Sequence, residues 1–118
     1  MAKIITAELE EPCVLYYTTI NKQKLLLDEK ADWPKVISHT YNERGTIIFN
    51  SPVICVGKIV PTDTFQVAFQ NNELLLSITL PHSVRIIGCG AFYKCSLLEE
   101  ITIPSSVNSI GYSAFSGC

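Results

Sequence analysis

The chain has 118 residues, of which 47% are hydrophobic and 17% charged, and its formal net charge is −2. That length fits one domain with a modest core, and the composition is too apolar for a disordered chain. The positive residues form no stripe and no apolar run approaches the roughly 20 residues that span a bilayer, so we expect neither nucleic-acid binding nor membrane insertion.

The first 46 residues predict β structure interrupted by loops. The start, MAKIITAELEEPC, lacks a long apolar block and carries three acids, so it does not resemble a secretory signal. The segment PCVLYYTTI at 12–20 is rich in β-branched and aromatic residues, which favours a strand. A loop with a short apolar island at 25–27 follows. VISHTY and TIIF then flank residues 42–45, and this arrangement predicts a hairpin with a four-residue loop.

The remainder of the chain repeats itself. ITLPHSVRIIGCGAFYKC at 78–95 aligns without gaps with ITIPSSVNSIGYSAFSGC at 101–118, and ten of the 18 positions are identical at an offset of 23. A degenerate copy precedes them at 47–72, with an insertion near 58–67; it places Phe69 and Asn72 at the positions of Phe92 and Cys95. A period of this length predicts stacked units, in which each unit buries the apolar face of its neighbour.

The residue types within one repeat explain how it would form a strand. Ile101 and Ile103 share one face and Thr102 takes the other, as the two-residue period of a strand requires. Pro104 lacks an N–H group and therefore ends that strand.

Two further repeat positions predict how neighbouring units pack. The ring of Phe92 would lie between those of Phe69 and Phe115 and fill the layer between units. Gly88 and Gly111 occupy one repeat position, and there we expect a corner with a positive φ angle.

The pattern I-T-[IL]-P-x-S-V-x-x-I-G-x-x-A-F-x-x-C resembles the repeats of the BspA-like leucine-rich repeat family over 47–118, most specifically over 78–118. The resemblance implies a mainly β fold with short helical turns, a right-handed leucine-rich-repeat solenoid of about three coils. It also implies a non-enzymatic adhesin or protein-binding scaffold, at a cell surface or secreted, whose partner is a protein or host glycoprotein. Because the start of the chain shows no signal, a cytoplasmic location stays open.

The two parts of the chain predict a capped repeat domain. We expect residues 1–46 to form a β-rich cap on the N-terminal end of the solenoid at 47–118, because a bare coil end would expose an apolar patch. The alternative for residues 1–46 is a separate ligand-binding module. For the whole chain, the alternative is a structural piece or cap of a longer repeat array, with no ligand of its own and with self-association through its uncapped C-terminal coil.

The sequence contains no recognisable catalytic, nucleotide-binding or metal-binding motif, so we expect no enzymatic activity, no cofactor and no metal. The number of cysteines is odd, five, which argues against a disulfide framework. Cys95 and Cys118 share a repeat position and are expected to be buried as small hydrophobes. Cys89 is expected to be exposed, which makes it the candidate for a reactive thiol. A zinc site from His82, Cys89 and Cys95 is a weaker alternative, because it lacks paired C-x-x-C spacing.

The remaining candidate for function is a surface. The outward positions of two neighbouring strands hold Ser77 and Thr79 in one repeat and Glu100 and Thr102 in the next. This row of short polar side chains predicts a face that binds a protein or glycan, and the alternative is an ordinary solvated strand face. The insertion near 58–67 is a second candidate, because loops added to a repeat often carry binding.

Overall fold

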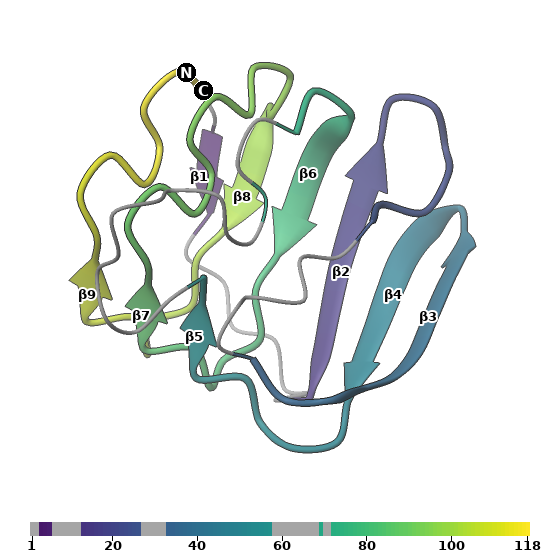
Figure 1. Cartoon of the computed structure of the whole chain (residues 1–118), viewed down its shortest axis with the longest axis horizontal. Coiled ribbons are helices and arrows are strands. Elements are labelled where there is room, and N and C mark those ends of the chain that lie inside the picture. Colours follow the sequence, from purple (N-terminus) through teal and green to yellow (C-terminus); the bar gives the residue numbers. More distant parts are fainter. Residues whose placement is uncertain (1–2, 6–12, 27–32, 58–68, 70–71) are drawn as a thin grey trace.

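The computed structural model describes residues 3–5, 13–26, 33–57, 69 and 72–118, so the insertion near 58–67 lies outside the described residues. The described residues form nine strands: β1 (Lys3–Ile5), β2 (Val14–Thr19), β3 (Val36–Asn42), β4 (Arg44–Phe49), β5 (Cys55–Val56), β6 (Leu75–Thr79), β7 (Ile86–Ile87), β8 (Glu100–Thr102) and β9 (Ser109–Ile110). One sheet has six strands in the order β1-β8-β6-β2-β4-β3, and the other has three in the order β5-β7-β9 (Figure 1). Within these ranges no helix is long and apolar enough to cross a membrane.

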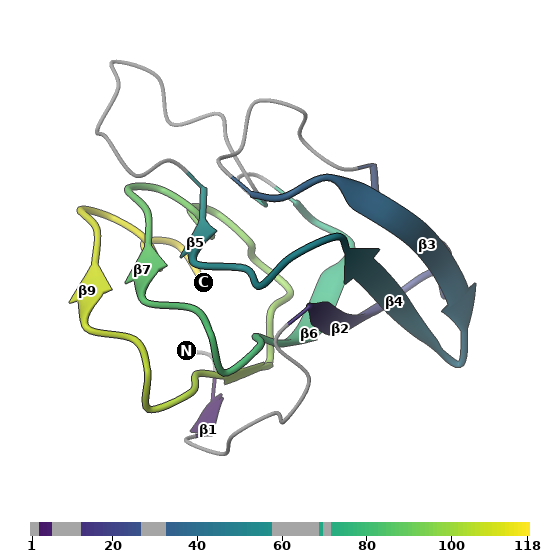
Figure 2. The same ribbon diagram turned by 90° about the horizontal axis from the view of Figure 1, so that it is seen from below.

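Equivalent residues of successive repeats lie side by side in both sheets. β6 and β8 pair in parallel with Ile78 opposite Ile101, and β7 and β9 pair in parallel with Ile87 opposite Ile110. Both pairings follow the offset of 23 found in the sequence. β5 adds the degenerate repeat, because Val56 lies opposite Ile87. Figure 2 shows the repeat strands of the two sheets on different sides of the repeat units, which therefore stack in register around a shared core.

The segment after each short strand consists of successive turns, which corrects the expectation of short helical turns. Three N–H groups donate to the carbonyl three residues earlier, those of Ala91, Tyr93 and Cys95. The intervening N–H groups donate to carbonyls of the following repeat, from Gly90 to Tyr112, Phe92 to Ala114 and Lys94 to Ser116, at 3.0, 2.8 and 2.8 Å. A helix would direct consecutive N–H groups within its own segment. Here every second N–H links one repeat to the next.

Left-handed residues recur with the same period. The repeats place positive φ angles at equivalent positions, Gly90 with Ser113 and Lys94 with Gly117. The expected positive φ at Gly88 and Gly111 is wrong, since neither residue adopts it. Gly111 is needed for a different reason: a Cβ there would collide with the backbone of Gly88 and Cys89. The glycine therefore permits close approach of two repeats.

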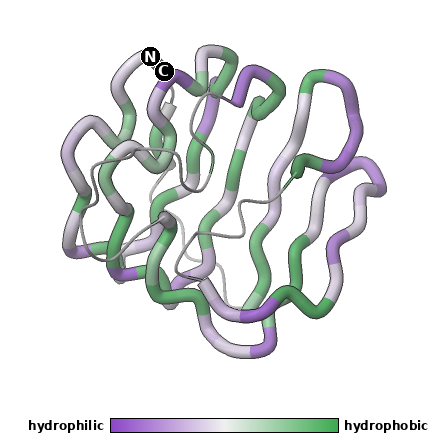
Figure 3. The backbone as a smooth tube through the Cα atoms, viewed as in Figure 1, coloured by the Kyte–Doolittle hydropathy of each residue, from purple (hydrophilic) through white to green (hydrophobic). Residues whose placement is uncertain are grey.

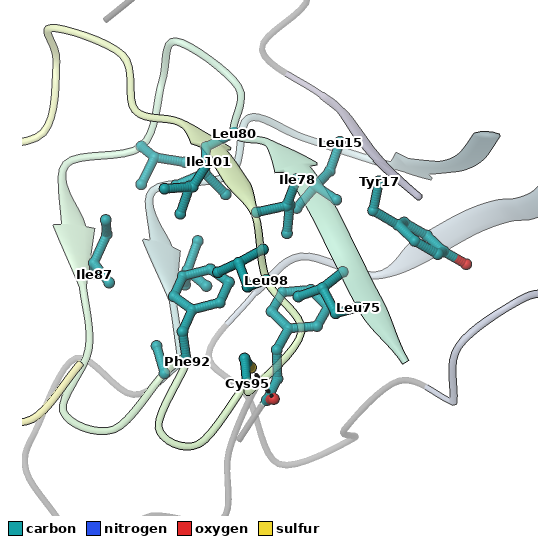
Figure 4. Packing of buried hydrophobic residues seen from close by; sticks show 14 of the residues in the cluster. Leu15, Tyr17, Leu75, Ile78, Leu80, Ile87, Phe92, Cys95, Leu98 and Ile101 are labelled. Atoms are coloured by element: carbon teal, nitrogen blue, oxygen red, sulfur yellow. Dashed lines mark hydrogen bonds between the residues drawn. The ribbon is translucent and has the colours of Figure 1, made fainter. Parts of the chain in front are cut away.

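Phenylalanine rings from three repeats stack at the centre of the core, as predicted from the sequence. Phe92 is fully buried, with its ring centroid 5.5 Å from that of Phe69 and 5.4 Å from that of Phe115. The ring planes differ by 10° and 2°. The Cys95 thiol donates a hydrogen bond to the carbonyl of Phe69 at 2.9 Å (Figure 4). The Cys118 thiol repeats this contact on the carbonyl of Phe92 at 3.1 Å. Each of the three repeats thus contributes one ring to the stack, and the two clear repeats each add one thiol.

The degenerate repeat uses Asn72 at the position that holds cysteine elsewhere. Its Oδ1 atom accepts hydrogen bonds from the N–H groups of Leu74 and Leu75 at 2.9 and 3.0 Å. An asparagine side chain commonly accepts hydrogen bonds from backbone N–H groups two or three residues later. Here these bonds stabilise the turn that precedes β6.

The strands β2, β4 and β3 extend the sheet on the side of the first repeat. β2 pairs antiparallel with both β6 and β4, and β3 forms the outer edge. The hairpin is tighter than predicted: Asn42 pairs with Arg44, so Glu43 alone makes the turn, with a φ of 61°. Gly45 packs beneath the ring of Tyr17, where a Cβ would collide with the ring. β4 crosses the predicted boundary after residue 46, and this division of the chain stays a prediction.

The strand β1 occupies a place that the sequence does not predict. It pairs in parallel with β8, on the edge of β8 that faces away from β6. The N-terminal region therefore borders the parallel strands on both sides, with β2 beside β6 and β1 beside β8 (Figure 1).

Candidate functional site

Alternate residues of the six-stranded sheet point away from the core and form what we call the outward face. In β2, Leu15 and Tyr17 are buried, whereas Tyr16 and Thr18 are partly exposed. This alternation follows from the two-residue period of a strand. Thr79 of β6 lies opposite Tyr16, so the outward face continues from the N-terminal strands into the repeats.

The four residues predicted from the sequence lie on two adjacent strands of this face. Ser77 is opposite Glu100, and Thr79 is opposite Thr102. Ser77, Thr79 and Glu100 are partly exposed, but Thr102 is only 9% exposed, because it lies between β6 and β1. The structure brings the four side chains together, and their role in binding stays a prediction.

An arginine and a tyrosine complete the face beside these residues. The guanidinium carbon of Arg44 lies 3.7 Å from the centroid of the Tyr16 ring, a cation–π contact. A depression of about 160 Å³ lies between β4, β2 and β6, lined by Tyr16, Tyr17, Thr18, Arg44, Ser77 and Thr79. Stacking on the ring holds the guanidinium in a defined place, with its N–H groups available to carboxylates and carbonyls.

Hydroxyl groups of neighbouring strands line this depression. The Oγ1 atom of Thr18 and the Oγ atom of Ser77 share a hydrogen bond of 2.5 Å, which joins β2 to β6 through their side chains. Hydroxyl groups both donate and accept, so the face suits peptide groups or sugar hydroxyls.

Sequence reasoning missed Tyr16, Thr18 and Arg44. The alternation within VLYYTT shows that Tyr16 and Thr18 share a face, but it does not reveal which strand lies beside β2. That pairing brings Thr18 against Ser77, 59 residues away.

A second, wider hollow lies beside the outer edge of the sheet. It has a volume of about 660 Å³ and is lined by Lys22, Gln23, Lys24, His39, Thr40, Tyr41 and Asn42. Figure 3 shows hydrophilic residues gathered at the loop after β2 and at the β3–β4 turn, which border this hollow.

A histidine that lines the second hollow contacts a buried tyrosine. The Nε2 atom of His39 and the hydroxyl of Tyr17 share a hydrogen bond of 2.5 Å, and that hydroxyl also accepts from the N–H of Leu25 at 3.0 Å. Burial, together with the nearby Lys24 ammonium group, lowers the pKa of His39. Burial raises the pKa of Tyr17. We assign no ligand to this hollow.

The cysteines are all free thiols in the structure. Cys95 is buried, and this burial raises its pKa to about 12, which suits a packing role. Cys89 is half-buried, less exposed than predicted. Within the described ranges no three His, Cys, Asp or Glu side chains gather into a group that could hold a metal ion, so the structure does not assemble His82, Cys89 and Cys95 into the alternative zinc site.

The fold and the outward face define a β-rich repeat protein whose units stack in register. Residues 62–118 match the family described as BspA type leucine rich repeat region (6 copies). This part of the chain therefore belongs to the BspA-type leucine-rich repeat family, as the pattern in 78–118 indicates. The match covers both clear repeats and the end of the degenerate one. No curated protein and no solved structure gives a significant match to the chain.

Proposed function

We propose that this chain is a non-enzymatic protein-binding scaffold that acts at a cell surface or outside the cell. In this proposal the stacked repeats are a short leucine-rich-repeat solenoid, and the outward face of its six-stranded sheet contacts a protein or host glycoprotein. The observation that carries the proposal is the Arg44–Tyr16 pair, set beside the hydroxyl groups of Ser77 and Thr79 on one continuous face.

The rigidity of this face supports a role in binding. Tyr16 stands on a central strand with a paired neighbour on each side, so its backbone is fixed before any partner arrives. Tyrosine and arginine are among the residue types that most often carry binding energy at interfaces, because each combines a large apolar surface with a polar group. A face that is ordered in advance also avoids the entropy cost of ordering during binding.

A binding experiment with matched variants tests this proposal. The full chain is passed over immobilised host cell-surface and matrix glycoproteins, and affinities are measured by surface plasmon resonance. We expect Tyr16→Ala and Arg44→Ala each to weaken binding by about tenfold or more. Asn108→Ala is the control, since Asn108 is exposed and lies next to β9 of the other sheet. Binding that is equal in all four proteins, or absent from the whole panel, would refute a ligand site at this face.

A second candidate function is structural. Ile110 of β9, the last strand of the smaller sheet, and Tyr112 just after it are among the exposed large hydrophobic residues. This exposure favours a scaffold whose end face packs against further repeats or a second copy. Sedimentation of the full chain and of Tyr112→Ser over a hundredfold range of concentration would test it. A monomer at every concentration in both proteins contradicts association of copies through this end.

A further inference from the structure

The strand β8 has the same register on both of its edges. On one edge Ser77, Ile78 and Thr79 of β6 lie opposite Glu100, Ile101 and Thr102. On the other edge Lys3, Ile4 and Ile5 of β1 lie opposite the same three residues, and the direction is again parallel. β1 therefore sits where a strand one repeat beyond β8 would lie, although it comes from the opposite end of the sequence.

The residues of β1 match this position at its centre. Ile4 continues the row formed by Ile78 and Ile101, so each of the three adjacent strands has isoleucine at the same register. Isoleucine is favoured on a pleated surface because its branched side chain packs against cross-strand neighbours. The strand on this edge of β8 thus resembles the strands of the repeats, although it comes from a segment outside the repeats.

The pairing of β1 is weaker than that of the repeat strands. β1 has three residues, and among the described strands it pairs with β8 alone. Ile4 is 55% exposed, whereas Ile78 and Ile101 are 1% and 0% exposed. Short edge strands with little buried apolar surface open at lower free energy than central strands. β1 is consequently the strand of this sheet whose place another strand could most readily take.

We propose that the edge of β8 is an acceptor site for one parallel, isoleucine-centred strand, filled by the chain's own β1 and open to the β1 segment of a second copy. A strand added to a sheet edge gains main-chain hydrogen bonds, and a side-chain position sets its specificity. Exchange of an identical element between copies is a low-cost route to a dimer, because the contacts formed are the same as those lost. This proposal is independent of any ligand at the outward face.

The test adds the strand in trans to the full chain. Unlabelled peptide MAKIITA, residues 1–7, is titrated to millimolar concentration into ¹⁵N-labelled protein, and the amide shifts of Glu100–Thr102 are followed by NMR. The proteins compared are the wild type and Ile4→Glu, which places a charge in the isoleucine row and weakens the internal strand. Since apparent affinity scales with the fraction of acceptor sites that are vacant, we expect Ile4→Glu to bind about tenfold more tightly than the wild type.

Controls separate strand exchange from a general effect of charge or instability. Ile20→Glu adds the same charge at a residue that is also 55% exposed but lies just after β2, and it should bind the peptide no better than the wild type. Peptide carrying Ile4→Glu should cause no shifts. If Ile4→Glu does not fold, Ile4→Ala takes its place. We expect the affinity of Ile4→Ala for the peptide to lie between that of the wild type and that expected for Ile4→Glu. Equal binding to all folded variants, or no shifts at Glu100–Thr102 in any of them, would overturn the proposal.

Discussion

Removal of the central ring of the phenylalanine stack gives the sharpest test of how the repeats hold together. Phe92 is fully buried and stacks on rings from both sides, whereas Phe115 is partly exposed and, among the described residues, stacks on Phe92 alone. A buried Phe→Ala change costs about 3–5 kcal/mol, through lost transfer free energy and the cavity left behind. We therefore expect Phe92→Ala to lose about 3–5 kcal/mol and Phe115→Ala about 1–2.5 kcal/mol, scaled down for its one ring partner and partial exposure.

Urea denaturation measures this difference directly. For a domain of this size, a loss of 3–5 kcal/mol lowers the unfolding midpoint by roughly 2–4 M. Because such a loss approaches the total stability of many domains, Phe92→Leu provides a milder variant with an expected loss of about 1–1.5 kcal/mol. The double variant should show a coupling of about 0.5–1.5 kcal/mol between the two rings. Equal losses at both positions with no coupling would refute the stacked core.

Three further predictions concern backbone strain, pH and thiol reactivity. Ser113→Gly should raise the free energy of unfolding by roughly 0.5–1 kcal/mol, because Ser113 has a φ of 55° at a position that glycine occupies one repeat earlier. Unchanged or lower stability would contradict this prediction. Because the folded state lowers the pKa of His39, the unfolded chain binds more protons below about pH 6.5, so stability should fall as the pH drops from 7.5 to 5.5. His39→Gln should flatten that profile, measured by urea unfolding at each pH, while His82→Gln serves as the control. Iodoacetamide at pH 8 should modify Cys95 far more slowly than Cys89, and mass spectrometry showing similar rates would exclude the buried, protonated thiol.

The repeat half of the fold could be predicted in detail because its determinants are local and periodic. The offset of 23 fixes which residues meet, so the placement of Phe92 between Phe69 and Phe115 follows from the alignment alone. The same alignment gives the Cys95 and Cys118 thiols equivalent hydrogen bonds, although Cys118, also expected to be buried, is only partly buried. Periodicity does not report φ angles, however. The sequence therefore does not reveal that Gly111 is needed for close contact with the backbone of the preceding repeat and not for a left-handed corner.

The candidate site could be predicted only in part, because half of it depends on pairing across the chain. Ser77 and Thr79 were found from strand alternation within a repeat. Their neighbour Tyr16 comes from a strand without a repeat counterpart, and Arg44 reaches the face through the tight turn at Glu43. Such non-local antiparallel pairings depend on the relative free energies of alternative partners, and a single sequence does not rank them.

The two strands that flank the parallel strands β6 and β8 are held in place to different extents. This difference affects where the domain first unfolds. Beside β6 lies β2, a six-residue strand whose other edge is held by β4 and whose Leu15 is fully buried. Beside β8 lies the three-residue β1, and within the described part of the chain no further strand pairs with it. Because unpaired main-chain groups at a sheet edge favour association with other strands, even a short strand protects β8. Local unfolding should therefore begin at β1. A strand from another molecule could then pair with β8 in the register that β1 occupies.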